Sequence, residues 1–297
     1  MENIKAPSHF KISEEVEKRM YQDTFRLLDT NVFGRFCEDM RKCNDTDLLE
    51  VENYSFRINP LSQYFYLCSP ANDESYFSKN KACALMDWYL NGDRDDLSIL
   101  KAFPEYEYPN IDDDNFIQIN ESTRQVFPKF NSNYGYYLFT QGFLFKAYEK
   151  LKANKNSRQA SISINSNQVM YDQSIDKLCT NNIMFRIRDN KLNMTVQMRS
   201  NDLIRNMVYD VFTFSLIYGI MFNSLTFTYP ELGVGEYYHT SASMHIHKSD
   251  IDKLMYAMKA ESQIRPCFKL RLNFYDPYYL DKLKAKVAKI TNLTFNV

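Results

Sequence analysis

Closely spaced cysteines are missing from this sequence. Its six cysteines are scattered, and no two of them are spaced as Cys-x-x-Cys. Disulfide frameworks and structural zinc sites both need paired or closely spaced cysteines, so the sequence predicts neither. Residues 1–21 are polar and charged and lack the apolar core of a signal peptide. We therefore expect a reducing, cytoplasmic compartment and no metal site.

Glycine, proline and net charge are also scarce. The chain has 7 Gly and 9 Pro, which excludes collagen-like and low-complexity sequences. It carries 36 Lys+Arg against 37 Asp+Glu, without the basic excess of proteins that neutralise nucleic-acid phosphates. The most apolar stretch, 208–225, is interrupted by polar side chains and predicts a buried helix, not a membrane span. We expect no direct nucleic-acid or membrane partner.

The 297 residues are 44% hydrophobic and 15% aromatic, enough for a large core without disulfides or metal. The pattern shows no internal repeat and no linker, so we predict one α+β domain over 1–297, a mixed sheet with flanking helices. The acidic stretch 103–130 is predicted to be an irregular surface excursion. Helices are predicted at 11–43, 77–91, 139–154, 202–225 and 248–260, and strands at 47–58, 158–164, 182–188, 192–198, 235–240 and 267–274.

The stretch 179–210 contains residues whose types and spacing indicate a catalytic site. Cys179 precedes a predicted hairpin with a turn at 189–191, and the second strand runs into Arg199-Ser200-Asn201-Asp202. The helix that follows carries an acid, Asp210. This order resembles the thymidylate synthase family, in which a nucleophilic cysteine precedes such a hairpin and an Arg-Ser-x-Asp motif.

Other segments resemble the same family in the same order, and the resemblance covers roughly 15–275. It implies a thymidylate-synthase-like mixed sheet packed back to back in a homodimer. The strand side chains of Ile183, Phe185, Ile187 and Val196 are then expected to be buried by the partner subunit. The supporting segments are Trp88-Tyr89-Leu90-Asn91-Gly92-Asp93, Asn133-Tyr134-Gly135, Asn156-Ser157-Arg158, and Gly235-Glu236-Tyr237-Tyr238-His239-Thr240 leading to His245.

The resemblance also implies the reaction, which adds a one-carbon unit from 5,10-methylenetetrahydrofolate to C5 of a pyrimidine nucleoside 5′-monophosphate. Cys179 is the expected nucleophile at C6, and Tyr134 is a further catalytic candidate. A thiolate near Arg199 is expected to have a lowered pKa. For an isolated cysteine a buried, inert thiol is the commoner role, but the Arg-Ser-x-Asp spacing favours the nucleophile.

Substrate-binding residues follow from the same motifs. Arg199 and Ser200 are expected to hold the 5′-phosphate, because a guanidinium fork and a hydroxyl match phosphate oxygens. Asp202 completes this motif as a substrate-binding candidate. Arg158 is expected to reach the phosphate from the partner subunit. Two further candidates, Arg41 and Lys42, stand near the place of a family arginine, where this sequence has Cys43; His245 resembles the histidine that contacts the sugar 3′-hydroxyl.

Asp210 distinguishes between bases. Thymidylate synthases have Asn at this place, whose donor and acceptor complement uracil N3–H and O4. A carboxylate only accepts, so it suits the exocyclic amine of cytosine together with a protonated N3. The resemblance is therefore greatest to the cytidylate hydroxymethylases, in which water rather than hydride completes the reaction. Such enzymes supply modified pyrimidines for viral DNA or for nucleoside natural products; for a viral source the expected compartment is the host cytoplasm.

Two departures from the family keep alternatives open. Leu85 stands where the family has a catalytic glutamate, and Asp87 is the nearest acid. The segment between Asp93 and Tyr134 has no tryptophan where the family stacks folate. One alternative is a methyl- or hydroxymethyltransferase that acts on uridylate. The other is a catalytically degenerate nucleotide-binding or structural member of the family.

Overall fold

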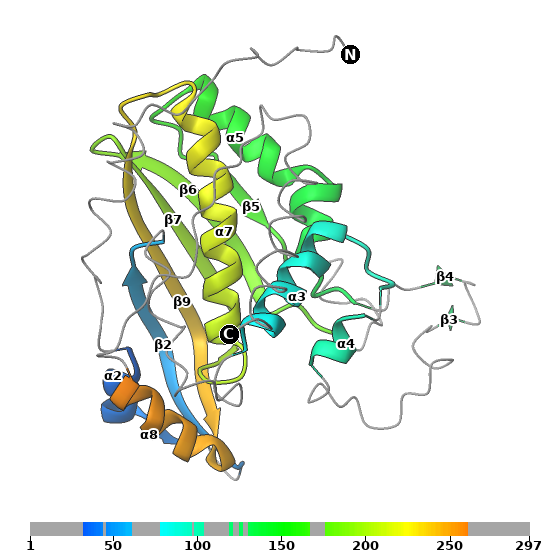
Figure 1. Ribbon diagram of the computed structural model, residues 1–297, viewed down its shortest axis with the longest axis vertical. Helices are drawn as coiled ribbons and strands as arrows, with labels where there is room; N and C mark the ends of the chain where they lie inside the picture. Colours follow the sequence, from blue (N-terminus) through cyan, green and yellow to red (C-terminus); the bar gives the residue numbers. More distant parts are fainter. Residues whose placement is uncertain are drawn as a thin grey trace, which may run out of the picture.

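The computed structural model describes residues 32–43, 46–60, 78–96, 98–103, 119–120, 125–126, 130–166 and 176–260. Within this part, seven strands form one sheet in the order β1-β2-β9-β7-β6-β5, with β8 paired beside β9. Strands β7 and β8 run parallel to β9, and the other neighbouring pairs are antiparallel. The sheet is thus mixed and helices flank it (Figure 1), which confirms the predicted α+β class.

The elements have the following bounds. The strands are β1 (Arg41–Lys42), β2 (Leu48–Ile58), β5 (Ser161–Ser163), β6 (Thr180–Arg188), β7 (Lys191–Met198), β8 (Asn201–Asp202) and β9 (Gly233–His247), with β3 (Ile119–Asn120) and β4 (Gln125–Val126) as a separate pair. The helices are α2 (Val32–Asp39), α3 (Lys79–Asn91), α4 (Ile99–Ala102), α5 (Phe143–Ala153), α7 (Met207–Thr226) and α8 (Ile251–Ala260). A π-helical turn, η2 (Tyr136–Thr140), precedes α5, and a 3₁₀ turn, η3 (Lys248–Asp250), precedes α8.

Helix α7 lies lengthwise across one face of the sheet (Figure 1). All twenty of its residues are buried, which agrees with the prediction of a core helix. By length and composition alone α7 is apolar enough to cross a membrane, but the protein itself covers it completely. Helix α7 also provides the crossover that makes β7 and β9 parallel neighbours.

The prediction that a partner subunit buries the apolar strand side chains is wrong. Ile183, Phe185 and Val196 are fully buried and Ile187 is 1% exposed within the single chain. Alternation in β6 and β7 correctly separates an apolar from a polar face, but the apolar face belongs to the protein's own core. The opposite face of the sheet is polar and more exposed.

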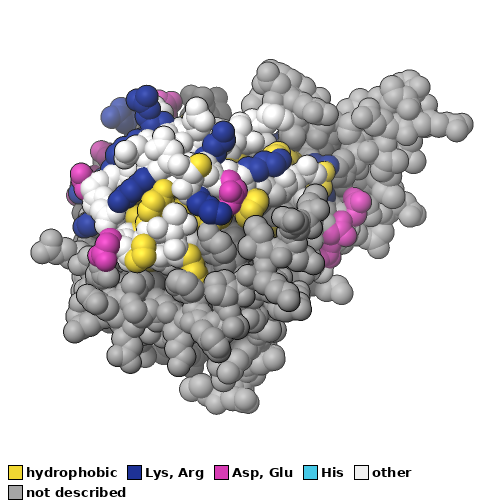
Figure 2. All heavy atoms as spheres, turned by 90° about the horizontal axis from the view of Figure 1, so that it is seen from above, with side chains coloured by type: hydrophobic (Ala, Val, Ile, Leu, Met, Phe, Trp, Pro, Cys, Tyr) yellow, Lys and Arg dark blue, Asp and Glu magenta, His cyan; other side chains and the backbone are white. Residues whose placement is uncertain are grey.

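That opposite face carries hydrogen-bonding side chains. Ser55 Oγ donates to Thr240 Oγ1 across β2 and β9 at 3.1 Å, and Arg57 pairs with Glu236 at 3.3 Å. Figure 2 looks down on one end of the molecule rather than onto this face, and there Lys and Arg side chains lie among polar groups and small separate hydrophobic patches. The described part of that view shows no continuous apolar surface.

Two local features fix the register of β6, β7 and β9 at the end of the sheet away from Cys179 and Arg199. The hairpin between β6 and β7 turns at Asp189 and Asn190, which both have positive φ, as a type I′ turn requires. Strand β9 changes register against β7 after Gly233 and Val234, and a Cβ on Gly235 would lie 2.3 Å from the Leu192 carbonyl oxygen. Glycine is therefore required where the irregularity brings the two backbones together.

The Trp88–Asp93 and Asn133–Gly135 segments pack against each other. Gly92 ends α3 in the left-handed conformation, and its amide donates to the Trp88 carbonyl. Asn133 Nδ2 donates to the carbonyls of Trp88 and Asp93, at 3.0 and 2.9 Å. A Cβ on Gly135 would lie 1.5 Å from the Tyr89 carbonyl oxygen, so only glycine fits this crossing.

Several predicted boundaries change. Helix α7 begins at Met207 rather than 202, because Asp202 belongs to β8. Strand β9 continues to His247, well beyond the predicted end at 240, and this extension carries His245. The predicted helix at 11–43 is described only from Val32, and the strand at 267–274 lies outside the described residues, as does most of the 103–130 excursion.

Candidate functional site

A cavity of about 440 Å³ opens between the start of α7, the ends of β7 and β9, and helices α3 and α4. Its lining side chains are of two kinds, which we call the apolar half and the polar half of the wall. One half is apolar and is formed by Leu85, Trp88, Ile99, Phe130 and Tyr209, among others. The other half is polar and contains seven of the predicted site residues: Tyr134, Cys179, Arg199, Ser200, Asp202, Asp210 and His245.

Cys179 lies directly before β6, and Arg199 lies directly after β7. The antiparallel register places Thr180 opposite Met198, so the hairpin necessarily brings Cys179 and Arg199 together. The Arg199 amide donates to the Cys179 carbonyl at 2.8 Å. Its guanidinium donates to two carbonyls of the preceding loop, from Nε to Leu178 at 2.8 Å and from Nη2 to Lys177 at 3.3 Å. The guanidinium thus fixes the loop that holds the thiol.

The expected lowering of the Cys179 pKa is wrong for the free protein. The pKa of the thiol is raised to about 11, mainly by burial and in smaller part by the charges of Asp210 and Asp176. The Arg199 guanidinium lowers this pKa but does not outweigh the burial. The thiol is therefore protonated at neutral pH, and any attack by sulfur has to be accompanied by loss of this proton.

Tyr134 supports the same segment from the other side. Its hydroxyl accepts a hydrogen bond from the Thr180 amide at 3.3 Å, next to Cys179. Its ring lies between Tyr89 and Phe214, with centroid distances of 5.3 and 6.0 Å. Burial raises the pKa of Tyr134 well above its usual value, so the hydroxyl stays protonated and remains a hydrogen-bond donor.

Asp210 occupies the first turn of α7 and is 7% exposed. Burial raises the pKa of its carboxyl to about 7, and a hydrogen bond with the Asn201 side chain partly opposes this rise. Asp210 is therefore not a solvent-facing acid on the surface of the helix. Near neutral pH, Asp210 is present as a mixture of carboxylic acid and carboxylate.

Asn201 links Asp210 to a buried histidine. Its amide nitrogen lies 3.1 Å from His239 Nε2, while His239 Nδ1 lies 2.8 Å from the Tyr237 hydroxyl. Burial lowers the pKa of His239 to about 3, so the ring is neutral, and a neutral Nε2 accepts from the Asn201 amide. This bond orients the carboxamide, and Asn201 Oδ1 is one of the buried oxygens in the described residues that lack a hydrogen-bond partner.

Asp202 and His245 lie side by side because β8 and β9 pair with these residues in register. Asp202 Oδ1 accepts from the amides of Ile204 and Arg205, at 2.9 and 2.7 Å, and so shapes the turn that leads into α7. Ser200 Oγ lies 3.4 Å from His245 Nδ1. Burial lowers the pKa of His245, which favours its neutral form.

Four predicted residues do not line the cavity. Asp87 is exposed on α3, whereas Leu85 faces the cavity, so the structure does not bring Asp87 to the place of the missing glutamate. Arg158 is exposed just before β5, and Arg41 and Lys42 are exposed on β1. The cavity instead offers a carboxyl group that the sequence analysis did not single out, Asp176, whose Oδ2 accepts from the Ser132 amide at 2.6 Å.

Other residues of the site also escaped the sequence analysis. Asn201 is the variable position of the Arg-Ser-x-Asp motif, and His239 looks like an ordinary strand residue. His247 follows His245 by two positions, which places both on the same face of a strand. That spacing was the signal in the sequence, but it becomes informative only once β9 is known to extend to His247.

The raised pKa of the buried Asp210 carboxyl predicts how the free energy of unfolding depends on pH. Its pKa is raised on folding, so the folded protein binds more protons than the unfolded chain between about pH 4 and 7. Its contribution to the free energy of unfolding therefore falls as the pH rises through this range and then levels off. Asp210→Asn removes this titration and should become more stable relative to wild type, by up to about 4 kcal/mol, as the pH rises from 4 to 8.

Urea unfolding of both proteins at several pH values measures this difference. His239 titrates in both proteins, so its opposite pH dependence cancels in the comparison. A difference in free energy that is the same at pH 4 and pH 8 would show that the Asp210 pKa is not raised.

Comparison with known proteins agrees with this geometry. The family model described as thymidylate synthase matches residues 84–294, more than two thirds of the chain. The matched region contains the whole polar half of the cavity wall. No curated protein matches the chain.

Proposed function

Because the chain belongs to the thymidylate synthase family, we propose that it is a cytidylate 5-hydroxymethylase that uses 5,10-methylenetetrahydrofolate. Family membership by itself supports the coarser function, a folate-dependent one-carbon transferase that acts on C5 of a pyrimidine nucleotide. The choice of cytosine, the roles of individual residues and the dimer are proposals, argued below from the described residues.

The observation that carries the choice of base is the buried Asp210 carboxyl, which shares a cavity with Cys179. Cytosine presents an amine at C4 and an unprotonated N3. A carboxyl with a pKa of about 7 is able to accept from the amine with one oxygen and to give its proton to N3 with the other. Opposite uracil, an ionised carboxylate faces O4, which is also an acceptor. The ionised form of Asp210 therefore disfavours uridylate.

The chemical step needs two proton movements that these side chains support. Sulfur of Cys179 forms a bond to C6, and the thiol proton leaves as this bond forms. The electron pair of the C5–C6 double bond then moves to C4–C5, and the electron pair of the C4–N3 double bond moves onto N3. The proton that Asp210 gives to N3 neutralises the charge that develops there. Asp176 is close enough to Cys179 to perturb its pKa, so its carboxylate is our candidate for the thiol proton.

The apolar half of the cavity suits a flat heteroaromatic ring system. Trp88 lines this half, and its indole N–H is already bonded to the Asp96 carbonyl at 2.9 Å, so the ring is held in place. Phe130 meets Trp88 edge to face, with centroids 5.4 Å apart. Methylenetetrahydrofolate bound here supplies the one-carbon unit. The side chains present fit such a ring, although Trp88 differs in position from the family's folate-stacking tryptophans.

The phosphate is proposed to bind at Arg199 and Ser200. Two donors of the Arg199 guanidinium are used by backbone carbonyls, which leaves its remaining N–H groups for phosphate oxygens. Arg158 lies away from its own chain's cavity, as a residue that completes the partner's site would. We therefore propose a homodimer through the polar sheet face; sedimentation as a monomer at micromolar concentration would contradict it.

Nucleotide binding tests the proposed function without requiring turnover. We expect CMP or dCMP to bind more tightly than UMP or dUMP, and CMP to bind at least tenfold more tightly than cytidine. Charge-assisted hydrogen bonds to phosphate contribute about 1.5–3 kcal/mol each, which accounts for the second difference. Calorimetric titration of all four monophosphates and of cytidine measures both. Equal affinity for cytidine and CMP would remove the phosphate site, and equal affinity for all bases would remove the role of Asp210.

Two alternatives have an observation in their favour. The protonated form of Asp210 offers a donor and an acceptor, so it is able to complement uracil as well, which favours the uridylate alternative. The apolar Leu85 in the cavity and the raised pKa of Cys179 favour a degenerate nucleotide-binding protein. Base preference in binding distinguishes the first alternative, and turnover distinguishes the second.

A further inference from the structure

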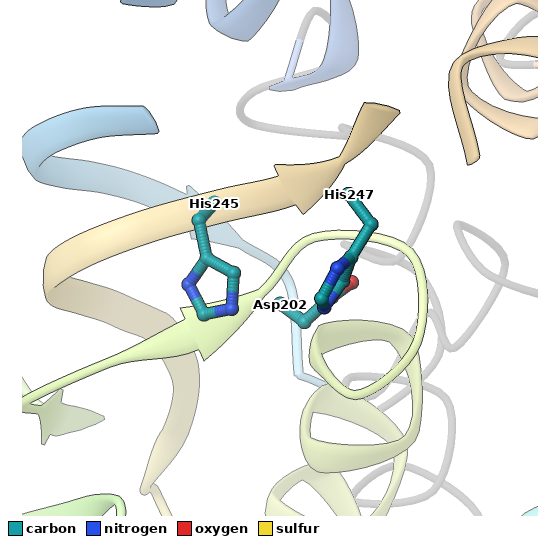
Figure 3. Close-up of side chains that lie close together, drawn as sticks. All are labelled: Asp202, His245 and His247. Carbon is teal, nitrogen blue, oxygen red and sulfur yellow. The ribbon is translucent and has the colours of Figure 1, made fainter. Parts of the chain in front are cut away.

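Three potential metal ligands converge at the end of β9. Asp202, His245 and His247 each have a ligand atom within 4.8 Å of the other two, and Figure 3 shows the three side chains turned toward one another. The convergence follows from the topology, since Asp202 pairs with His245 between β8 and β9, and His247 lies on the same face two residues on. The sequence analysis expected no metal site from the spacing of the cysteines, and it did not connect Asp202 with the histidines, which are far from it along the chain.

The Asp202 carboxylate leaves one oxygen free for a cation. Its Oδ1 accepts two backbone amides, whereas Oδ2 is buried and has no hydrogen-bond partner among the described residues. The residue is only 3% exposed, and the nearest cationic candidate, His247 Nε2, is 3.9 Å away, beyond hydrogen-bond distance. A buried carboxylate oxygen without a partner is costly, and a bound cation would offset that cost.

The histidine nitrogens are suitably arranged. His245 Nδ1 faces the Ser200 hydroxyl at 3.4 Å, which leaves Nε2 for a metal. A partner of this kind on the other ring nitrogen orients the imidazole and is usual for metal-binding histidines. His247 presents Nε2 on the Asp202 side, and its side chain is 39% exposed, so an ion has a route in from solvent.

We propose that Asp202, His245 and His247 bind one divalent cation of the later first transition row, such as Zn²⁺ or Co²⁺. Ligand atoms about 2.1 Å from one tetrahedral ion lie about 3.4 Å apart, so the 3.9 Å pair needs to close by about 0.5 Å and separations of up to 4.8 Å by at most about 1.4 Å, which side-chain rotation allows. Two imidazoles and one carboxylate favour these ions over Mg²⁺ and Ca²⁺, which prefer all-oxygen ligands.

The three side chains leave a coordination position open. Asp202 and His245 line the cavity, so this open position faces it. An oxygen of a bound nucleotide is then able to complete the coordination, and this last step alone rests on the proposed function. Binding of the cation itself does not depend on nucleotide or folate.

Titration of chelator-treated, full-length protein with Co²⁺, without nucleotide or folate, tests the site. We expect one Co²⁺ per chain, with visible absorption bands of a nitrogen- and oxygen-ligated ion. His247→Ala should weaken binding at least about tenfold, because it removes one of three protein ligands. Glu149→Ala, which removes a partly exposed carboxylate of α5 outside the cluster, is the control and should bind as wild type does.

Two further variants keep the result decisive. His247→Gln replaces the ring by a polar side chain that retains some bulk, and it should show the same loss if His247→Ala is unstable. Cys179→Ser should retain the ion, because no thiolate belongs to the site. Absence of stoichiometric Co²⁺ binding, unchanged affinity in both His247 variants, or loss of binding in Cys179→Ser would overturn the proposal. The assay contains no nucleotide, so its result tests the metal site independently of the proposed reaction.

Discussion

Replacing Cys179 by alanine is expected to abolish turnover while nucleotide binding survives. The sulfur forms the bond to C6 that makes C5 reactive, and no other described side chain of the cavity offers a thiol. Removal of a catalytic nucleophile reduces turnover by about 10⁴-fold or more in well-studied enzymes. Release of tritium from C5 of the pyrimidine measures the addition step directly, and calorimetry measures binding.

Cys83 provides a matched control for this experiment. It is a buried thiol on α3 and does not line the cavity. Cys83→Ala should keep the tritium release that Cys179→Ala loses. Measurable turnover in Cys179→Ala would contradict the covalent mechanism. If wild type itself binds nucleotide but never releases tritium, the degenerate alternative takes its place.

The sequence predicted the contents of the cavity where local connectivity determines them. A hairpin with a two-residue turn brings its first and last residues together, so the spacing from Cys179 to Arg199 was sufficient. The helix after the Arg-Ser-x-Asp motif then carries Asp210 to the same place. The Trp88–Asp93 and Asn133–Gly135 motifs were found separately in the sequence, and the close approach at Gly135 explains why both have the residues they have.

Burial was harder to predict than position. Alternation identified Ile183 and Phe185 as an apolar face but could not say that the chain's own core, rather than a second subunit, covers it. The prediction of a lowered Cys179 pKa was wrong for the same reason. The sequence shows the neighbouring Arg199, but it shows neither the burial of the thiol nor the nearby charge of Asp176. Long-range pairing also hid the cluster of Asp202 with His245, which depends on the unexpected length of β9.

Replacing Asp210 by asparagine is expected to move base preference from cytidylate toward uridylate. The carboxamide has a fixed donor and acceptor, so it no longer gives a proton to cytosine N3, and it offers a donor to uracil O4. A site with a buried polar mismatch typically rejects the wrong partner by several kcal/mol, so the ratio of kcat/KM for the two bases should change by about 10²-fold or more.

Asn201→Ala is the companion variant. It removes the carboxamide that bonds to Asp210 while leaving the carboxyl in place. We expect it to weaken binding of both bases without reversing their order. If Asp210→Asn leaves the order of the two bases unchanged, then Asp210 does not read the base, and the uridylate alternative gains support.

The wild-type arm of the same assay tests the central claim most directly. The protein is incubated separately with CMP, dCMP, UMP and dUMP in the presence of methylenetetrahydrofolate, and the masses of the nucleotide products are measured by mass spectrometry. We predict that CMP or dCMP gains the mass of one CH₂O unit and that the uridylates remain largely unchanged. A gain of CH₂ on a uridylate, or no product from any of the four nucleotides, would contradict a cytidylate hydroxymethylase.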